Sequence, residues 1–200
     1  MPKTLGKRVY FCFHYQDVID QRVPIVRKHW LSKEDHDDAG SFDGTTWNSA
    51  SQSGPAYIRR LIDHDLEHTS VTCVLIGTQT YARRWVRYEI IESIQRRNLL
   101  IGVHINGIPD KSRRTSPPGR NPLEHLALSI ADDGTSVKVL QYSSGDWIPF
   151  ADSPGWSLSK PAPAERRGKS LQLSTMYRVY DWVTDNGPEN FDRWLGVSIE

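Results

Sequence analysis

The fold is decided by residues 70–98, which read SVTCVLIGTQTYARRWVRYEIIESIQRRN. Residues 71–76 form a run of strand-favouring side chains, which is typical of a strand that is covered on both faces. Apolar residues then recur four apart from Val86 to Ile94, as one face of a helix requires. The stretch therefore predicts a central strand, a short polar turn over residues 77–84, and a helix.

The same alternation continues on both sides of this stretch. Residues 8–13 (RVYFCF) and 99–105 (LLIGVHI) are two more strand-prone runs, and helical patterns lie between the runs. Strands that alternate with helices predict an α/β fold with a parallel central sheet. In such a sheet, ligands bind beyond the carboxyl ends of the strands. We therefore expect the turn FHYQD, residues 13–17, to share a functional edge with the turn over residues 77–84.

The C-terminal part is less regular. Residues 137–142 and 147–150 flank the turn SSGD and predict a hairpin or an edge addition to the sheet. A helical stripe over residues 176–183 and a shorter one over residues 188–195 predict two helices. We therefore divide the chain into an α/β domain over residues 1–150 and a C-terminal extension over residues 151–200, a loop and two helices packed on the same domain.

The composition bounds the class of protein. The 200 residues suit one substantial domain, and a net charge of +1 predicts no general attraction to nucleic acid or to an acidic membrane. The chain has no apolar run near the roughly 18 residues of a membrane span, and the N-terminus lacks the apolar core of a signal peptide. We therefore expect a cytoplasmic protein. Cys12 and Cys73 lie in predicted core strands, where we expect them to be reduced and structural.

Several motifs of known chemistry are absent from the sequence. It contains no G-x-G-x-x-G after the first strand, no G-x-x-x-x-G-K-[ST] and no G-x-S-x-G, which argues against dinucleotide redox, phosphoryl-transfer and acyl-transfer chemistry. His64 and His68 have the spacing of zinc ligands, but Asp65 stands where a zincin has glutamate. Histidines in the last turn of a helix also favour its negative end. We therefore predict no metal site, although the acidic residues 34–38 leave a divalent ion open.

Two further features have both a functional and a structural interpretation. Glu89 points about 100° away from the centre of its helical stripe, where a carboxylate can line a crevice or simply be solvated. Phe42 and Trp47 stand in a long polar loop, where they can dock on the domain or form a stacking wall for a flat ring. Spacing alone does not separate these interpretations.

A family resemblance adds to this reading. A first strand that ends in a polar, aromatic turn, a long second loop, and a strand followed by TYARRWVRYEI resemble the TIR domain, in which W-x-x-x-E opens a helix; Trp85 and Glu89 occupy those places. The segments FHYQDVID, TSVTCVLIGTQTYARRWVRYEI, IGVHIN and YRVYDWV are together similar to the TIR-like proteins of the Thoeris anti-phage defence system, over nearly the whole chain. Arg83 and Val86 depart from the receptor-adaptor TIR pattern, so substrate contacts there cannot be carried across.

The resemblance implies a fold and an activity. The fold would be the three-layer, flavodoxin-like TIR fold with a central parallel sheet, plus an elaborated C-terminal hairpin and helices. The activity would be cleavage of NAD+ between nicotinamide and ribose, with Glu89 as the catalytic residue and a cyclic ADP-ribose isomer as the product. NAD+ would be the substrate, with no separate cofactor. The product would signal to a downstream effector, and activity would depend on self-association and an infection trigger.

The remaining site residues follow from the chemistry of NAD+. Aromatic side chains would stack on nicotinamide or adenine, an arginine would pair with the pyrophosphate, and polar groups would bond a ribose. The candidates are Tyr15, Phe42, Trp47 and Tyr81 for stacking, Arg84 for the pyrophosphate, and His14 or Asp17 for a ribose. Two alternatives stay open: a non-enzymatic TIR-like interaction module and, against the near-neutral charge, a metal-dependent nuclease that uses residues 34–38 with His64 and His68.

Overall fold

The central element is a five-stranded parallel sheet. The structure is a computed structural model that describes residues 8–33, 36–39 and 52–196. The strand order is β10-β4-β3-β1-β2, and every neighbouring pair is parallel. The strands are β1 (Arg8–Phe13), β2 (Asp37–Ala39), β3 (Val71–Ile76), β4 (Leu99–His104) and β10 (Val179–Asp181). This is the doubly wound order of flavodoxin-like folds, so the predicted α/β class with a parallel sheet is confirmed.

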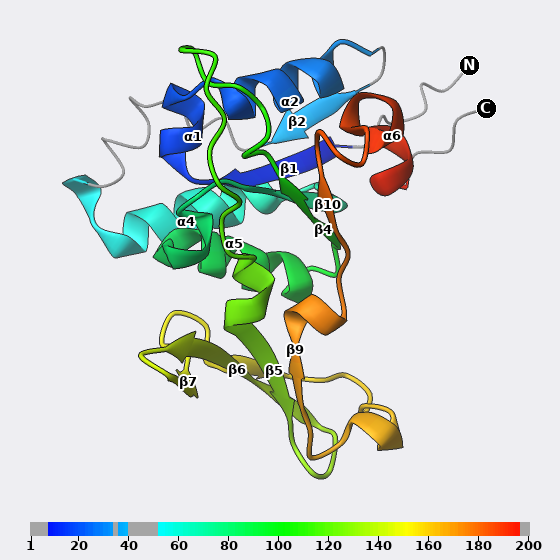
Figure 1. Ribbon diagram of the computed structural model, residues 1–200. Helices are drawn as coiled ribbons and strands as arrows, with labels where there is room; N and C mark the ends of the chain where they lie inside the picture. Colours follow the sequence, from blue (N-terminus) through cyan, green and yellow to red (C-terminus); the bar gives the residue numbers. More distant parts are fainter. Residues whose placement is uncertain (1–7, 34–35, 40–51, 197–200) are drawn as a thin grey trace, which may run out of the picture.

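Helices cover both faces of this sheet and give three layers (Figure 1). One face packs against α2 (Arg22–Leu31) and α6 (Gly187–Trp194), which follow β1 and β10 in the chain. The opposite face packs against α4 (Pro55–Leu66) and α5 (Arg84–Gln95). The helix expected after β1 is split into α1 (Tyr15–Ile19) and α2, because Gln21 between them adopts a left-handed backbone with φ 66°. No helix in the described ranges is long and apolar enough to cross a membrane.

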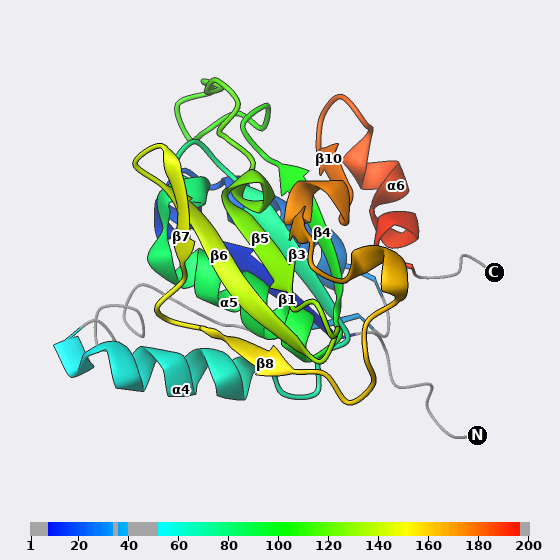
Figure 2. The same ribbon diagram turned by 90° about the horizontal axis from the view of Figure 1, so that it is seen from below.

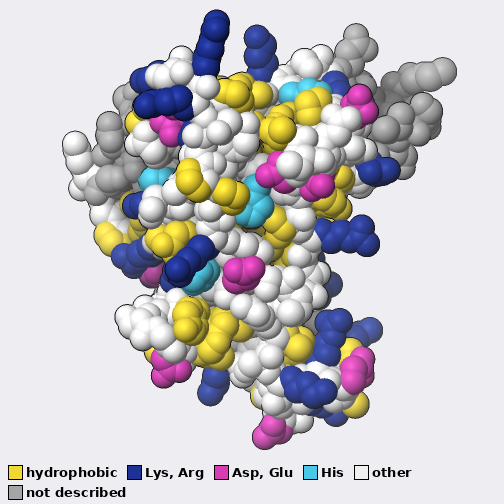
Figure 3. Space-filling view, in the orientation of Figure 1, with side chains coloured by type: hydrophobic (Ala, Val, Ile, Leu, Met, Phe, Trp, Pro, Cys, Tyr) yellow, Lys and Arg dark blue, Asp and Glu magenta, His cyan; other side chains and the backbone are white. Residues whose placement is uncertain are grey.

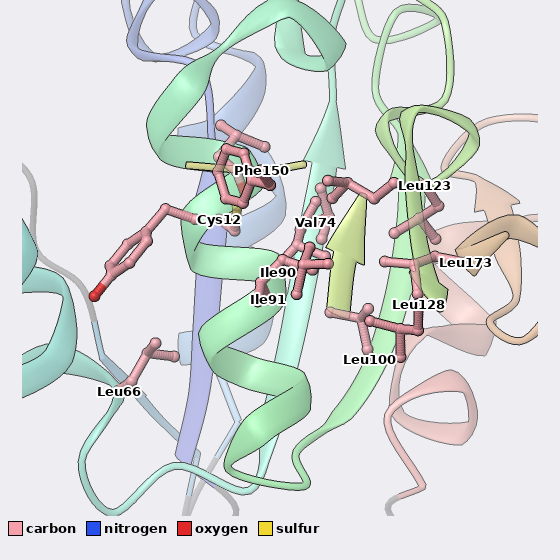
Figure 4. Close-up of a cluster of buried hydrophobic side chains, with 14 of the residues drawn as sticks. Cys12, Leu66, Val74, Ile90, Ile91, Leu100, Leu123, Leu128, Phe150 and Leu173 are labelled. Carbon is pink, nitrogen blue, oxygen red and sulfur yellow. The ribbon is translucent and has the colours of Figure 1, made fainter. Parts of the chain in front are cut away.

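The pleat of β1 decides which side chains meet which helices. Phe11 packs with α2 and α6, whereas Tyr10 and Cys12 belong to the cluster beneath α5. Figure 4 shows Cys12 and Ile90 in this cluster. Cys12 and Cys73 lie on adjacent strands but in opposite clusters, and both are free thiols. Side chains two apart on β1 therefore reach the underside of α5, the helix that carries Glu89.

A second, antiparallel sheet lies beyond α5 (Figures 1 and 2). Its order is β7-β6-β5-β9, and β8 also pairs with β6. The strands are β5 (Leu126–Ile130), β6 (Ser136–Ser143), β7 (Asp146–Pro149), β8 (Gly155–Ser157) and β9 (Ser170–Gln172). The hairpin expected over residues 137–150 is present, but in this separate sheet and not at the edge of the parallel one. Leu128, Val137 and Val139 pack into the same cluster as Ile90, so α5 is covered on two sides.

Of the two expected C-terminal helices, the one over residues 188–195 is confirmed as α6, and the one over residues 176–183 is wrong. Residues 176–183 do not form a helix: they contain β10, which pairs with β4. The ring of Tyr180 stacks on Trp194 of α6 at a centroid distance of 4.3 Å, and this contact with α6 favours the strand over the helical stripe. The extension therefore has α6 as its one α-helix among the described residues. The boundary at residue 150 stays a prediction, and strands of the second sheet come from both sides of it.

The loop over residues 106–121 packs over the carboxyl end of β3. Asn106 binds the loop through its side chain: Nδ2 donates to Ser116 Oγ at 3.1 Å, and Oδ1 accepts from the Gly119 amide at 3.2 Å. Gly119 lies directly on the carbonyl of Gly77, and Gly77 in turn lies on the carboxylate of Asp17. Neither glycine has room for a Cβ, so the loop, Gly77 and Asp17 pack tightly and fill the edge beyond β3. The space beside β1 stays open.

We expect Gly119→Ala to lower the free energy of unfolding by about 1–3 kcal/mol, because its Cβ would collide with the Gly77 carbonyl oxygen. Urea denaturation would measure the change. Thr115→Ala is the control, since Thr115 is exposed in the same loop, and it should change stability by less than about 0.5 kcal/mol. Equal stability of the two variants would mean that the loop does not pack on Gly77.

Candidate active site

A cavity of about 370 Å³ opens at the carboxyl end of β1, between the turn into α1 and the first turns of α5. The chain leaves β1 toward the α1/α2 side and leaves β3 toward α5 on the other side, so the cavity lies at the topological switch point of the sheet. Aromatic side chains make much of its wall: Phe11, Phe13, Tyr15 and Trp85. This is the place and the lining that a binding site for a flat organic ring requires.

Glu89 lines this cavity from the second turn of α5. Glu89 is only 5% exposed, and the Tyr10 hydroxyl donates a hydrogen bond to its Oε1 at 3.0 Å. No donor in the described part of the chain reaches Oε2 with hydrogen-bond geometry. Burial raises the pKa of Glu89 to about 7, although the nearby Cys12 thiol and the Tyr10 hydroxyl lower it. A buried acid with one unpartnered oxygen and a pKa near neutrality is a strong candidate for a functional group.

The start of α5 places Trp85 and Glu89 together. Arg83 is the N-cap with an extended backbone, and α5 begins at Arg84. Residues four apart lie on the same face of a helix, so Trp85 and Glu89 both face the cavity. The W-x-x-x-E spacing in the sequence thus places both side chains on the wall of the cavity.

Three cationic or titratable side chains, Arg83, Arg84 and His14, line the cavity beside the aromatic wall. They differ in their existing hydrogen bonds and in their charge. Arg84 donates to Asp152 through Nε at 2.7 Å and Nη2 at 2.6 Å, and its guanidinium lies 4.7 Å from the Trp85 ring centroid. Arg83 is exposed, and its one side-chain hydrogen bond to the described residues is from Nε to the Gln79 carbonyl at 3.3 Å. Burial and the nearby Arg83 lower the pKa of His14, which is therefore neutral at pH 7. Arg83 is thus the less committed of the two arginines.

The structure places four of the predicted site residues on the cavity and two elsewhere. Glu89, His14, Tyr15 and Arg84 line it. Asp17 does not: it is 4% exposed, packs on Gly77 and lies 4.0 Å from Arg22, and burial raises its pKa to about 6. The one-turn advance of α1 past His14 carries it to the β3 side.

Tyr81 also lies away from the cavity. Its ring is 5.1 Å from His125, and Arg120 stacks on it at 5.6 Å, so it packs toward the second sheet. Phe42 and Trp47 fall outside the described residues. Sequence reasoning did not single out Phe13, Tyr10 or Arg83 as site residues. The period-two pattern of β1, which turns Tyr10 toward α5, was the available signal for Tyr10.

No metal site is apparent where the chain is described. Within residues 8–33, 36–39 and 52–196, no three His, Cys, Asp or Glu side chains gather as metal ligands would. His64 instead lies 3.3 Å from the neighbouring Asp65. On the face shown in Figure 3, Lys and Arg side chains are scattered among acidic and hydrophobic ones, unlike the stripe of a nucleic-acid binder.

Comparisons with known proteins give similarities to one family. Residues 10–110 match the family model described as "Thoeris protein ThsB, TIR-like domain". A protein of Bacillus cereus (strain MSX-D12), named "Putative cyclic ADP-D-ribose synthase ThsB1", is 44% identical over 191 residues, which cover 96% of this chain and 100% of the relative. The matched range includes every residue that lines the cavity, from Phe11 to Glu89.

Proposed function

Because this chain belongs to the Thoeris ThsB family of TIR-like proteins, we propose that it cleaves NAD+ between nicotinamide and ribose and closes the ADP-ribose part into a cyclic isomer. One observation carries the proposal: the buried Glu89, whose Oε2 has no hydrogen-bond partner among the described residues, on the wall of an aromatic cavity at the switch point of the sheet. The relative's name supplies the product class, and the cavity supplies a matching chemistry.

The chemistry needs one carboxylate. Nicotinamide in NAD+ carries a positive charge and leaves as a neutral molecule, so no acid has to protonate it. The barrier is set by the oxocarbenium-like cation that forms on the ribose. An ionised Glu89 next to that carbon would stabilise the cation, and burial would strengthen the attraction because the local dielectric is low.

The cavity also supports roles for the residues around Glu89. Trp85 and Tyr15 would hold a substrate ring by stacking, and the neutral His14 would bond a ribose hydroxyl. Arg83 is better placed than Arg84 to pair with the pyrophosphate, since Asp152 already occupies the guanidinium of Arg84. Cyclisation then requires a nucleophile of the same molecule to reach the ribosyl carbon before water does.

The biological part of the proposal follows from family membership. We propose that the cyclic product is a nucleotide signal to a downstream effector in anti-phage defence, and that self-association and an infection trigger control the enzyme. The runner-up is a non-enzymatic interaction module, which would leave NAD+ intact.

Incubation of the purified protein with NAD+, alone and with lysate from phage-infected cells, tests the activity. We expect release of nicotinamide and a second product one water lighter than ADP-ribose by mass spectrometry. Linear ADP-ribose alone would indicate hydrolysis without cyclisation. No nicotinamide with any lysate would contradict the enzyme and favour the interaction module, while activity lost on adding a chelator would favour metal chemistry.

Tyr10→Phe should move the pH dependence of cleavage toward alkaline pH by about one unit. The variant removes the hydroxyl that donates to Glu89 Oε1, and this hydrogen bond favours the ionised form, so the pKa of Glu89 rises. Rates measured from pH 5.5 to 9 report the shift. Tyr57→Phe, an exposed tyrosine on α4, should leave the profile unchanged. An unshifted profile for Tyr10→Phe would mean that Glu89 does not limit the rate through its charge.

A further inference from the structure

Asp152 joins the second sheet to the two helices beneath the parallel sheet. It lies in the turn after β7, outside residues 10–110, and its side chain is 7% exposed. Its carboxylate accepts from Arg59 of α4 at 2.5 Å and from Nε and Nη2 of Arg84 of α5 at 2.7 and 2.6 Å. Two parallel hydrogen bonds to one carboxylate are the most strongly oriented ion-pair geometry that arginine makes.

The orientation of Arg84 is transmitted to the cavity wall. The side chain of Arg84 is 53% exposed, so without a partner it would sample many rotamers. Bound to Asp152, it lies 4.7 Å from the ring centroid of Trp85, which lines the cavity. The carboxylate of Asp152, the guanidinium of Arg84 and the indole of Trp85 therefore contact one another in series, from the second sheet to the wall of the site.

Other contacts hold α5 to the same sheet along its length. Arg87 Nη1 donates to Gln141 Oε1 of β6 at 2.8 Å, and Gln95 Nε2 donates to Ser153 Oγ at 3.3 Å. Phe150 is buried in the same cluster as Ile90. Of these three polar contacts among the described residues, the Arg84–Asp152 pair is the one whose arginine lines the cavity and stacks on a second lining residue, Trp85.

We propose that Asp152 is a positioning residue of the active site: it holds Arg84 on Trp85 and thereby fixes the aromatic wall that receives the substrate ring. The second sheet is then a working part of the site and not an appendage. The inference rests on the proposed NAD+ cleavage, because it assigns a role in binding that substrate. It also explains why an arginine next to the site is not available to the pyrophosphate.

The test measures NAD+ binding separately from its cleavage. In a Glu89→Gln background, where turnover should be too slow to interfere, calorimetry with NAD+ should show a Kd about tenfold weaker when Asp152→Asn is added. In the wild-type background, Asp152→Asn should raise KM about tenfold and change kcat by less than about threefold. Arg84→Gln should reproduce this effect, and the double variant should be no worse than either single one, because both break the same contact.

Arg59→Gln is the matched control. It removes a different partner of the same carboxylate, one that does not touch the cavity, and should leave KM within about twofold even if it lowers Tm. Equal Kd values with and without Asp152, or equal KM effects of Arg59→Gln and Arg84→Gln, would overturn the proposal and leave Asp152 a structural residue. Should Asp152→Asn fail to fold, the exposed Arg84→Gln decides alone. No NAD+ binding in the Glu89→Gln protein with Asp152 intact would instead contradict the proposed function itself.

Discussion

Glu89→Gln is expected to reduce NAD+ cleavage by about 10³-fold, with a smaller change in the affinity for NAD+. The substitution keeps the shape of the side chain and leaves an amide oxygen that can accept from the Tyr10 hydroxyl. It removes the negative charge that would face the ribosyl cation. Because that cation exists only in the transition state, the loss should fall on kcat. Nicotinamide release under conditions where the wild type is active measures it.

Glu92→Gln is the control for this loss. Glu92 lies on the same helix, is half-buried and does not line the cavity, so the same chemical change there should leave the rate within about threefold. If Glu89→Gln retained the wild-type rate while Glu92→Gln did not, the reacting centre would be on the other side of α5. If both retained it, the cavity would not be the site of cleavage.

The parts of this site that lie close together in sequence could be predicted from it. Around residue 77 the pattern of apolar residues changes from a continuous run to a four-residue repeat. The run predicts a strand and the repeat predicts a helix, and the structure has β3 and α5 there. The same helical geometry places Trp85 and Glu89 one turn apart on one face. Local periodicity therefore predicted the helix and the face that carries Trp85 and Glu89, whereas the role proposed for Glu89 came from the family resemblance.

What sequence reasoning missed depends on contacts between distant segments. Arg84 was expected to bind a pyrophosphate, but its partner Asp152 comes from a turn 68 residues away. Residues 176–183 have a helical stripe, yet pairing with β4 and stacking of Tyr180 on Trp194 favour a strand. Tertiary contacts of this kind outweigh a local preference of a few tenths of a kcal/mol per residue.

The same Glu89→Gln variant should also be more stable than the wild type above pH 7. The pKa of Glu89 rises from 4.5 to about 7 on folding, a difference of about 2.5 units, because burial disfavours the charge. The folded protein thus binds a proton more tightly than the unfolded chain, and stability falls as pH rises from 4.5 through 7. At about 1.36 kcal/mol per unit, the full cost of ionising Glu89 is about 3 kcal/mol at pH 8 and nearly absent at pH 4.5.

Glutamine carries no charge to bury, so the variant should gain about 2–3 kcal/mol at pH 8, or a Tm higher by about 4–12 °C, and almost nothing at pH 4.5. Thermal unfolding at the two pH values measures the difference, and Glu124→Gln, at an exposed position, should differ from wild type by less than about 0.5 kcal/mol at both. A variant less stable than wild type at pH 8 would show that the carboxylate is well solvated in the folded state. A gain in stability joined to a loss of cleavage would mean that the chain keeps a destabilising charge at this position because the reaction needs it.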